Sequence, residues 1–255
     1  MMCFCTSVSP WQTTMSDRTV QDEIIGYLAD AGLRIRASSA IPAGERPKAT
    51  RFAHFLARRY YRDRLARSFR YSHRLFRETG RAAEQVADSQ EFSGFLETCV
   101  MGSLASAQRV SEMARAHLSA ISLEPWWADL LDYERAYFLQ AATAERATGA
   151  TEQPARGLSA LCWHFAWALP EMLPRLRSGE PGGDDLRRES TLLFSRTHMG
   201  RIYVVEVEAA MERIFTAVDG LRTSEQIAGA AGVSPDSARR MLAALANIGA
   251  VEFRS

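Results

Sequence analysis

The sequence predicts an α+β protein that is mostly helical, with a helical N-terminal domain followed by a smaller mixed domain. Three observations predict this fold class. Between residues 51 and 138, apolar side chains recur every three or four positions, which is typical of helices with one buried face. Residues 190–255 combine β-branched and aromatic runs with short helical patterns. The segment 179–185 contains three glycines and a proline, so it indicates a linker between the two parts.

The first fifty residues are expected to hold one helix and a linker. Residues 17–31 repeat apolar side chains at helical spacing, and Gly32 ends the pattern. Residues 37–50 are rich in Ser, Pro and Gly, which predicts a loop. Met15 and the residues after it resemble a more natural start of translation than Met1. Residues 1–14 are therefore expected to be poorly ordered or to follow from a misassigned upstream start.

Residues 51–180 are expected to form a helical domain around three main helices. The first covers 51–77 and the second 91–118. The third, 126–138, has a wide apolar face, so we expect it to be the central helix of an all-α bundle. Further along, apolar and small side chains alternate over 161–169, and this period of two favours a strand.

The helix expected over 51–77 interleaves arginine with aromatic residues. We favour an amphipathic helix with buried aromatics and arginines in water, or a protein interface built on it. A surface for nucleic acid or an acidic partner is the other interpretation. Asp129, Asp132 and Glu134 are expected to pair with these arginines. A catalytic role for Asp132 or Glu134 is disfavoured because no histidine or second acid has a fitting spacing.

Residues 190–255 are expected to form the smaller domain. Two strand-like runs, 191–196 and 201–207, flank the turn His198-Met199-Gly200, which predicts a hairpin. Three short helices should follow and then a last extended piece. Their expected bounds are 210–218, 225–231, 235–247 and 251–253. This order is winged-helix-like.

Because winged helices commonly read DNA, a DNA-binding transcription regulator is the alternative function. A recognition helix needs exposed side chains that reach bases and phosphates, and residues 235–247 offer few of them. Charges across 221–255 are nearly balanced, whereas a DNA-binding face should be clearly basic. Nucleic acid is therefore disfavoured as a partner.

The composition of the chain does not favour an acidic or a basic partner. Its 255 residues carry a net charge of +1. The sequence shows no membrane-spanning segment and no signal peptide, so we expect a cytoplasmic protein with reduced thiols. His164 near Cys162 could suggest a metal ligand, but we favour a partly buried histidine on the small-residue face. We expect no metal site, cofactor or catalytic residue in this chain.

The hairpin and the helices after it resemble PqqD-like domains, which recognise leader peptides in ribosomal-peptide modification systems. The resemblance rests on Tyr203–Gly220, Thr223–Ile227 and Met241–Leu245. In that family a precursor peptide adds as an extra strand on the hairpin edge and lies against the third helix. The resemblance implies that the peptide-binding residues are Ile202, Tyr203, Val204, Val205, Glu206, Arg239, Arg240 and Ala243.

The helical part has its own likeness. Arg59–Phe69 and Pro125–Ala136 resemble two helices of the HvfC/BufC family, whose members are partners of TIM-barrel, multinuclear non-haem iron oxygenases. These enzymes modify cysteine in precursor peptides, and relatives of the family serve methanobactin and 3-thiaglutamate biosynthesis. A helical domain before a PqqD-like element is similar to the TglI-like members in particular.

This resemblance implies a non-catalytic subunit that forms a heterodimer with an iron oxygenase and recruits a precursor peptide for cysteine modification. The irons are then expected in the partner enzyme. The partner-binding residues are expected to be Arg62, Arg70, Trp126, Trp127 and Asp129.

Overall fold

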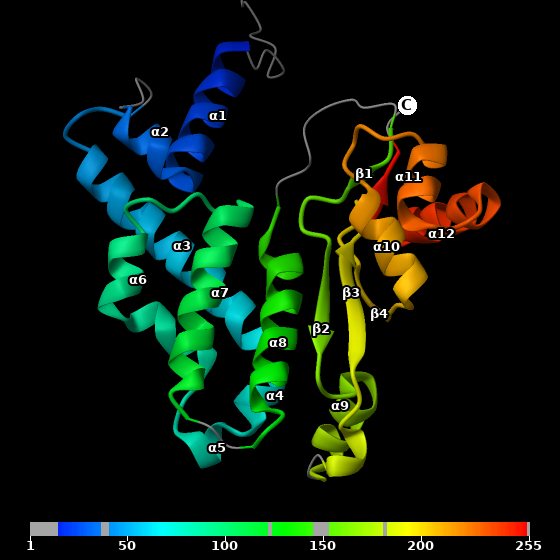
Figure 1. Ribbon diagram of the computed structural model, residues 1–255. Helices are drawn as coiled ribbons and strands as arrows, with labels where there is room; N and C mark the ends of the chain where they lie inside the picture. Colours follow the sequence, from blue (N-terminus) through cyan, green and yellow to red (C-terminus); the bar gives the residue numbers. More distant parts are fainter. Residues whose placement is uncertain (1–14, 37–40, 122–123, 145–152, 181–182, 254–255) are drawn as a thin grey trace, which may run out of the picture.

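A computed structural model describes most of the chain, namely residues 15–36, 41–121, 124–144, 153–180 and 183–253. The described chain is α+β and mostly helical, with small antiparallel sheets, which confirms the expected fold class at this level (Figure 1). The expectations for residues 1–14 lie outside the described residues.

The N-terminal half is helical. Its elements are α1 (Met15–Ala29), α2 (Ala31–Ile35), α3 (Arg46–Ser68), α4 (Arg70–Arg74), α5 (Phe76–Thr79), the 3-10 helix η1 (Ala83–Asp88), α6 (Gln90–Phe95), α7 (Leu104–Ser119) and α8 (Trp127–Ala142).

The C-terminal half contains all five strands of the described chain. Its elements are β1 (Ala155–Arg156), β2 (Leu161–Phe165), α9 (Leu169–Ser178), the 3-10 helix η2 (Asp184–Leu186), β3 (Ser190–Arg196), β4 (Ile202–Glu206), α10 (Ala209–Ala217), α11 (Ser224–Ala231), α12 (Pro235–Asn247) and β5 (Val251–Glu252).

The helix expected over 51–77 is broken at Phe69, so this prediction is wrong in its extent. Phe69 has φ −89° and ψ 46°, outside helical geometry, and α4 starts anew behind it. The side-chain carboxyl group of Glu134, on α8, accepts hydrogen bonds from the backbone N–H groups of Tyr71 (2.6 Å) and Ser72 (3.2 Å). A distant carboxyl group therefore satisfies donors that open the first turn of α4.

Glu134 is fully buried, and this burial raises the pKa of its carboxyl to about 8, although the Tyr71 and Ser72 donors and the nearby Arg70 oppose the shift. An ordinary glutamate in the unfolded chain titrates near 4.5. At pH values between these two pKa values, Glu134 retains its proton in the folded protein and releases it in the unfolded chain. The contribution of Glu134 to the free energy of unfolding is therefore fully present below the pKa of the unfolded chain. It is lost as the pH rises towards the pKa of the folded protein.

A second predicted helix, 91–118, is also broken, into α6 and α7. Gly102 between them has φ +82°, and a side chain at this position would approach the methyl group of Ala144 to 2.8 Å. Ser103 then caps α7 by accepting the N–H of Ser106 at 3.2 Å. Helix α6 has already ended at Phe95, and the turn at Gly102 and the cap at Ser103 begin α7.

The N-terminal bounds differ from prediction as well. The first helix ends at Ala29 because Asp30 adopts extended geometry and its carboxylate caps α2 through the N–H of Gly32 at 2.7 Å. Helix α3 begins at Arg46, inside the segment expected to be a loop.

Helix α8 is central, as predicted, but it is not the centre of an all-α bundle. One side packs on α3, α4 and α7, and the other on the sheet formed by β2, β3 and β4. Figure 1 shows α8 between the helical layer and these strands. The strand predicted over 161–169 is present as β2, but it ends at Phe165, and Leu169 starts α9.

The three-stranded sheet separates two hydrophobic clusters. Leu192 and Phe194 belong to the cluster around α8, whereas Leu193 belongs to the one formed by α10, α11 and α12. Strand β2 precedes the predicted linker at 179–185 and pairs with β3, which follows it. The sheet therefore crosses the predicted domain boundary.

We expect the substitution Glu134→Gln to remove a pH dependence of stability. From about pH 5 to pH 8, the free energy of unfolding of the native protein should fall by up to about 1.4 kcal/mol per pH unit relative to the variant. Glutamine retains an oxygen acceptor for the α4 donors but does not titrate. Urea unfolding at several pH values measures both slopes, and parallel slopes would contradict the assignment.

Candidate functional site

Within the described chain the three-stranded sheet has two outer strands, β2 and β4, and the β3–β4 hairpin supplies the second of these edges. The strand order is β2-β3-β4, so β3 has partners on both sides and β4 has one. The hairpin predicted from the sequence is confirmed, with Gly200 at φ +82° in its turn. Positive φ favours glycine there because a side chain would be strained. The position of β2 determines which hairpin strand lies at the edge.

The register shows which backbone groups of β4 point away from β3. Val207 donates its N–H to the carbonyl of Thr191, and Thr197 donates to Arg201, both at 2.9 Å. Hydrogen-bonded and non-hydrogen-bonded pairs alternate along an antiparallel ladder. Ile202, Val204 and Glu206 therefore direct their N–H and C=O groups outward. This row is called the free edge below.

The side chains of β4 divide between the two faces of the sheet. Val204 is half-buried against the cluster around α8, and Val205, which points to the other face, is 37% exposed. Tyr203 is also half-buried, and the guanidinium of Arg201 lies 5.1 Å from the centre of its ring. A strand added beside β4 would meet apolar surface on both faces.

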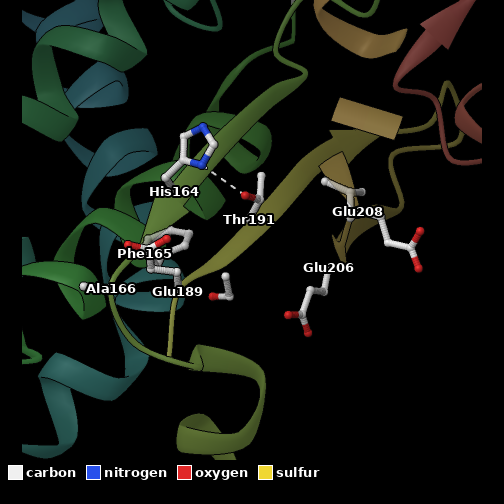
Figure 2. Close-up of a pocket in the computed structure, with 9 residues that line it drawn as sticks. His164, Phe165, Ala166, Glu189, Thr191, Glu206 and Glu208 are labelled. Carbon is white, nitrogen blue, oxygen red and sulfur yellow. Dashed lines mark hydrogen bonds between the residues drawn. The ribbon is translucent and has the colours of Figure 1, made fainter. Parts of the chain in front are cut away.

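A hollow of about 900 Å³ lies where β2 and β4 end and β3 begins (Figure 2). Its lining is His164, Phe165, Ala166, Glu189, Ser190, Thr191, Glu206, Val207 and Glu208. Glu206 forms an ion pair with Arg188 at 3.1 Å. Sequence reasoning singled out Glu206 but missed Glu189 and Glu208, because only the sheet register brings them together. The free edge thus ends beside an acidic hollow.

His164 does not lie in the partly buried environment that we expected. Its side chain is 70% exposed, with Nε2 2.9 Å from Glu212 on α10 and Nδ1 3.0 Å from the hydroxyl of Thr191. Figure 2 shows the imidazole and Thr191 side by side on neighbouring strands. The alternation places His164 on the face towards α10, where a polar partner holds it at the rim of the hollow.

The residues predicted on the third helix lie apart from the free edge. Arg239, Arg240 and Ala243 are exposed on α12, whose main packing partners are α10, α11 and β5. Arg239 pairs with Asp236 at 3.0 Å and with Glu225 of α11 at 3.9 Å. The predicted peptide-binding set therefore lies on two surfaces, with the β4 residues together and the α12 residues on another element.

Two of the predicted partner-binding residues are not on the surface. Trp126 and Trp127 are each only 4% exposed, and Trp127 donates its indole N–H to the carbonyl of Leu118 at 3.4 Å. Their apolar area stabilises the helical core, so the prediction of an interface there is wrong. Arg62, which pairs with Asp88, and Arg70, which contacts Tyr71, remain accessible.

The acids of α8 do not pair with the arginines of α3, contrary to expectation. Asp129 accepts the backbone N–H groups of Ala166 (2.7 Å) and Trp167 (3.0 Å), which joins α8 to the turn after β2. Partial burial raises the pKa of this carboxyl, although both hydrogen bonds oppose the shift. Asp132 instead forms an ion pair with Arg115 on α7.

The two thiols in the described chain are poor nucleophiles. Burial raises the pKa of Cys99 to about 11 and that of Cys162 to about 12, so both remain protonated at neutral pH. Within the described ranges, no group of three or more His, Cys, Asp or Glu side chains is arranged to hold a metal ion. No described helix is long and apolar enough to cross a membrane.

Comparison with known proteins does not identify a family. No protein-family model matches the sequence, and no curated protein matches it. The likeness of Arg59–Phe69 and Pro125–Ala136 to the HvfC/BufC family thus stays an expectation. The geometry of the chain has to support any function proposed for it.

We expect Asp129→Ala to lower the free energy of unfolding by about 1–3 kcal/mol, because two backbone N–H groups lose their acceptor. Asp129→Asn, which retains an oxygen acceptor, should be affected much less. Urea unfolding compares the three proteins. Equal stability of the alanine variant would show that Asp129 does not hold the turn after β2.

Proposed function

We propose that this chain is a non-catalytic subunit that binds an extended precursor peptide and presents it to a separate enzyme. The enzyme would be a TIM-barrel, multinuclear non-haem iron oxygenase that modifies cysteine, in a pathway of the 3-thiaglutamate type. The single observation that carries the proposal is the free edge of β4. The order of β3, β4, α10, α11, α12 and β5 supports a winged-helix-like, PqqD-like domain around it.

Strand addition at the free edge would use groups that the fold already aligns. Ile202, Val204 and Glu206 each offer one N–H and one C=O to an incoming strand. Each hydrogen bond is worth about 0.5–1.5 kcal/mol net. Apolar contacts of the peptide with Val204 on one face and Val205 on the other would then add specificity.

The edge also carries features that limit unspecific pairing. Strand β4 has only five residues, and Glu206 places a charge at its end. Short length and charge are the usual protection of edge strands against aggregation. An edge protected in this way still accepts a partner that matches its charge and side chains, which favours a dedicated peptide.

Two further observations support a binding role over the DNA-reading alternative and over catalysis. Arg239 of α12 pairs with Asp236 and Glu225, so part of the positive charge that a DNA-reading helix would need is neutralised. Both described thiols are protonated at neutral pH, and we expect the irons to belong to the partner enzyme. A subunit of this kind needs surfaces for two partners and no reactive group of its own.

Co-expression with a TIM-barrel, multinuclear non-haem iron oxygenase of a cysteine-modifying pathway tests the partnership. We expect a one-to-one complex in size-exclusion chromatography, with iron present by metal analysis. Recovery of this chain alone, as a monomer or homodimer that shifts duplex DNA at moderate salt, would support the regulator instead.

The substitution Val204→Pro tests the free edge. Proline removes an N–H that points away from β3, so the β3–β4 ladder remains while the added strand loses a donor. We expect the affinity for the precursor peptide of that oxygenase to fall about tenfold or more. Fluorescence anisotropy with a labelled peptide measures this change.

Val204→Thr is the matched control, because it retains both the N–H group and the β-branched shape. Its affinity for the peptide should stay close to that of the native protein, and both variants should still bind the oxygenase. Equal peptide affinity of the proline variant would exclude strand addition at β4.

A further inference from the structure

The outer face of α3 exposes two phenylalanines, although the sequence pattern favours buried aromatics on this helix. Phe52 is 51% exposed and Phe55 is 55% exposed, with ring centroids 6.4 Å apart and planes 18° from parallel. The buried face of α3 uses Ala53, Ala57 and Tyr61 instead. An exposed aromatic pair leaves apolar area in water that burial against a partner would remove.

Two arginines flank this pair. Arg51 lies four residues before Phe55 and Arg59 four residues after it, so all three share one side of the helix. Arg51, Phe52, Phe55 and Arg59 are called the basic-aromatic face below. Among the described residues, the side chains of Arg51 and Arg59 have no hydrogen-bond or ion-pair partner.

Other arginines of the same helix are engaged within the fold. Arg58 donates to the carbonyl of Ala87, Arg62 pairs with Asp88, and Arg64 donates to the carbonyl of Ala141 at 3.2 Å. The arginines that reach η1 or α8 thus find acceptors, whereas those beside the phenylalanines do not. The two free guanidinium groups are available to carboxylates on another molecule.

The position of the basic-aromatic face separates it from the free edge. Helix α8 packs on α3 on one side and on β4 on the other. Figure 1 shows α3 in the helical layer and β4 across α8 from it. Two partners could therefore occupy the two surfaces at the same time.

We propose that the basic-aromatic face docks a protein partner whose surface carries an apolar group flanked by carboxylates. Burial of the phenylalanines would supply the contact, and Arg51 and Arg59 would pair with the acids. Aromatic residues and arginine are the residue types that most often dominate the affinity of protein interfaces. This inference rests on the proposed function, under which the partner is the iron oxygenase.

Nucleic acid fits the basic-aromatic face less well. A phosphate backbone requires a row of cations, yet only two guanidinium groups here are unpaired, and the exposed Asp63 follows one turn after Arg59. The charges are too few and too mixed for a phosphate track. Two unpaired guanidinium groups instead match a protein surface that carries a few carboxylates.

The test compares variants of α3 with matched controls. Phe52→Gln combined with Phe55→Gln, and separately Arg59→Glu, should weaken the complex with the partner oxygenase about tenfold or more. The controls are Leu221→Gln, at a side chain that is 80% exposed elsewhere, and Arg67→Glu, at another exposed arginine of α3. They should change the affinity about twofold at most.

Isothermal titration calorimetry with purified oxygenase gives these affinities, and thermal unfolding verifies that every variant folds. Peptide binding at β4 should be unchanged in all of them. Wild-type affinity in the α3 variants would overturn this inference while leaving the proposed function intact. Failure of the native protein to bind the oxygenase would overturn both.

Two other results would also overturn the inference by assigning the face to another occupant. One is a homodimer of the native chain that dissociates in the double phenylalanine variant. The other is binding of single-stranded DNA that is lost in Arg59→Glu.

Discussion

The burial of β3 on both faces is the constraint on which the rest of the structure depends. Leu193 packs towards α10–α12, and Leu192 and Phe194 pack towards α8, all with 1% exposure or less. One strand thus joins two hydrophobic clusters. Because β2 covers one edge of β3 and β4 the other, the sheet can extend only beyond its outer strands, and the hairpin places β4 at one of these two edges.

Local sequence signals predicted the C-terminal half well. The hairpin turn at Gly200 and the caps at Thr223 and Ser234 act within a few residues, so their geometry follows from neighbouring side chains. The run Leu192-Leu193-Phe194 also lacks the alternation of a one-sided strand. That continuous apolar run is the signal by which the two-sided burial of β3 could have been predicted.

The helical half was harder to predict because distant residues determine its breaks. The helix interruption at Phe69 depends on Glu134, which is 63 residues away from Tyr71 in the sequence. No local sequence pattern near Phe69 predicts this interruption. Trp126 and Trp127 have the composition of an interface, but also that of a core, and sequence alone does not distinguish the two. For Phe52 and Phe55 a helical projection against Tyr61 and Leu65 would have shown the exposed side.

The shared sheet has a consequence for the evolution and engineering of the C-terminal module. A fragment that begins after the linker at 179–185 would lack β2, so both outer edges of its hairpin would be open, and Leu192 and Phe194 would face water. Recombination at that linker would therefore not transfer a self-sufficient unit. A transferable module would have to begin before Leu161 and bring with it a substitute for the surface of α8.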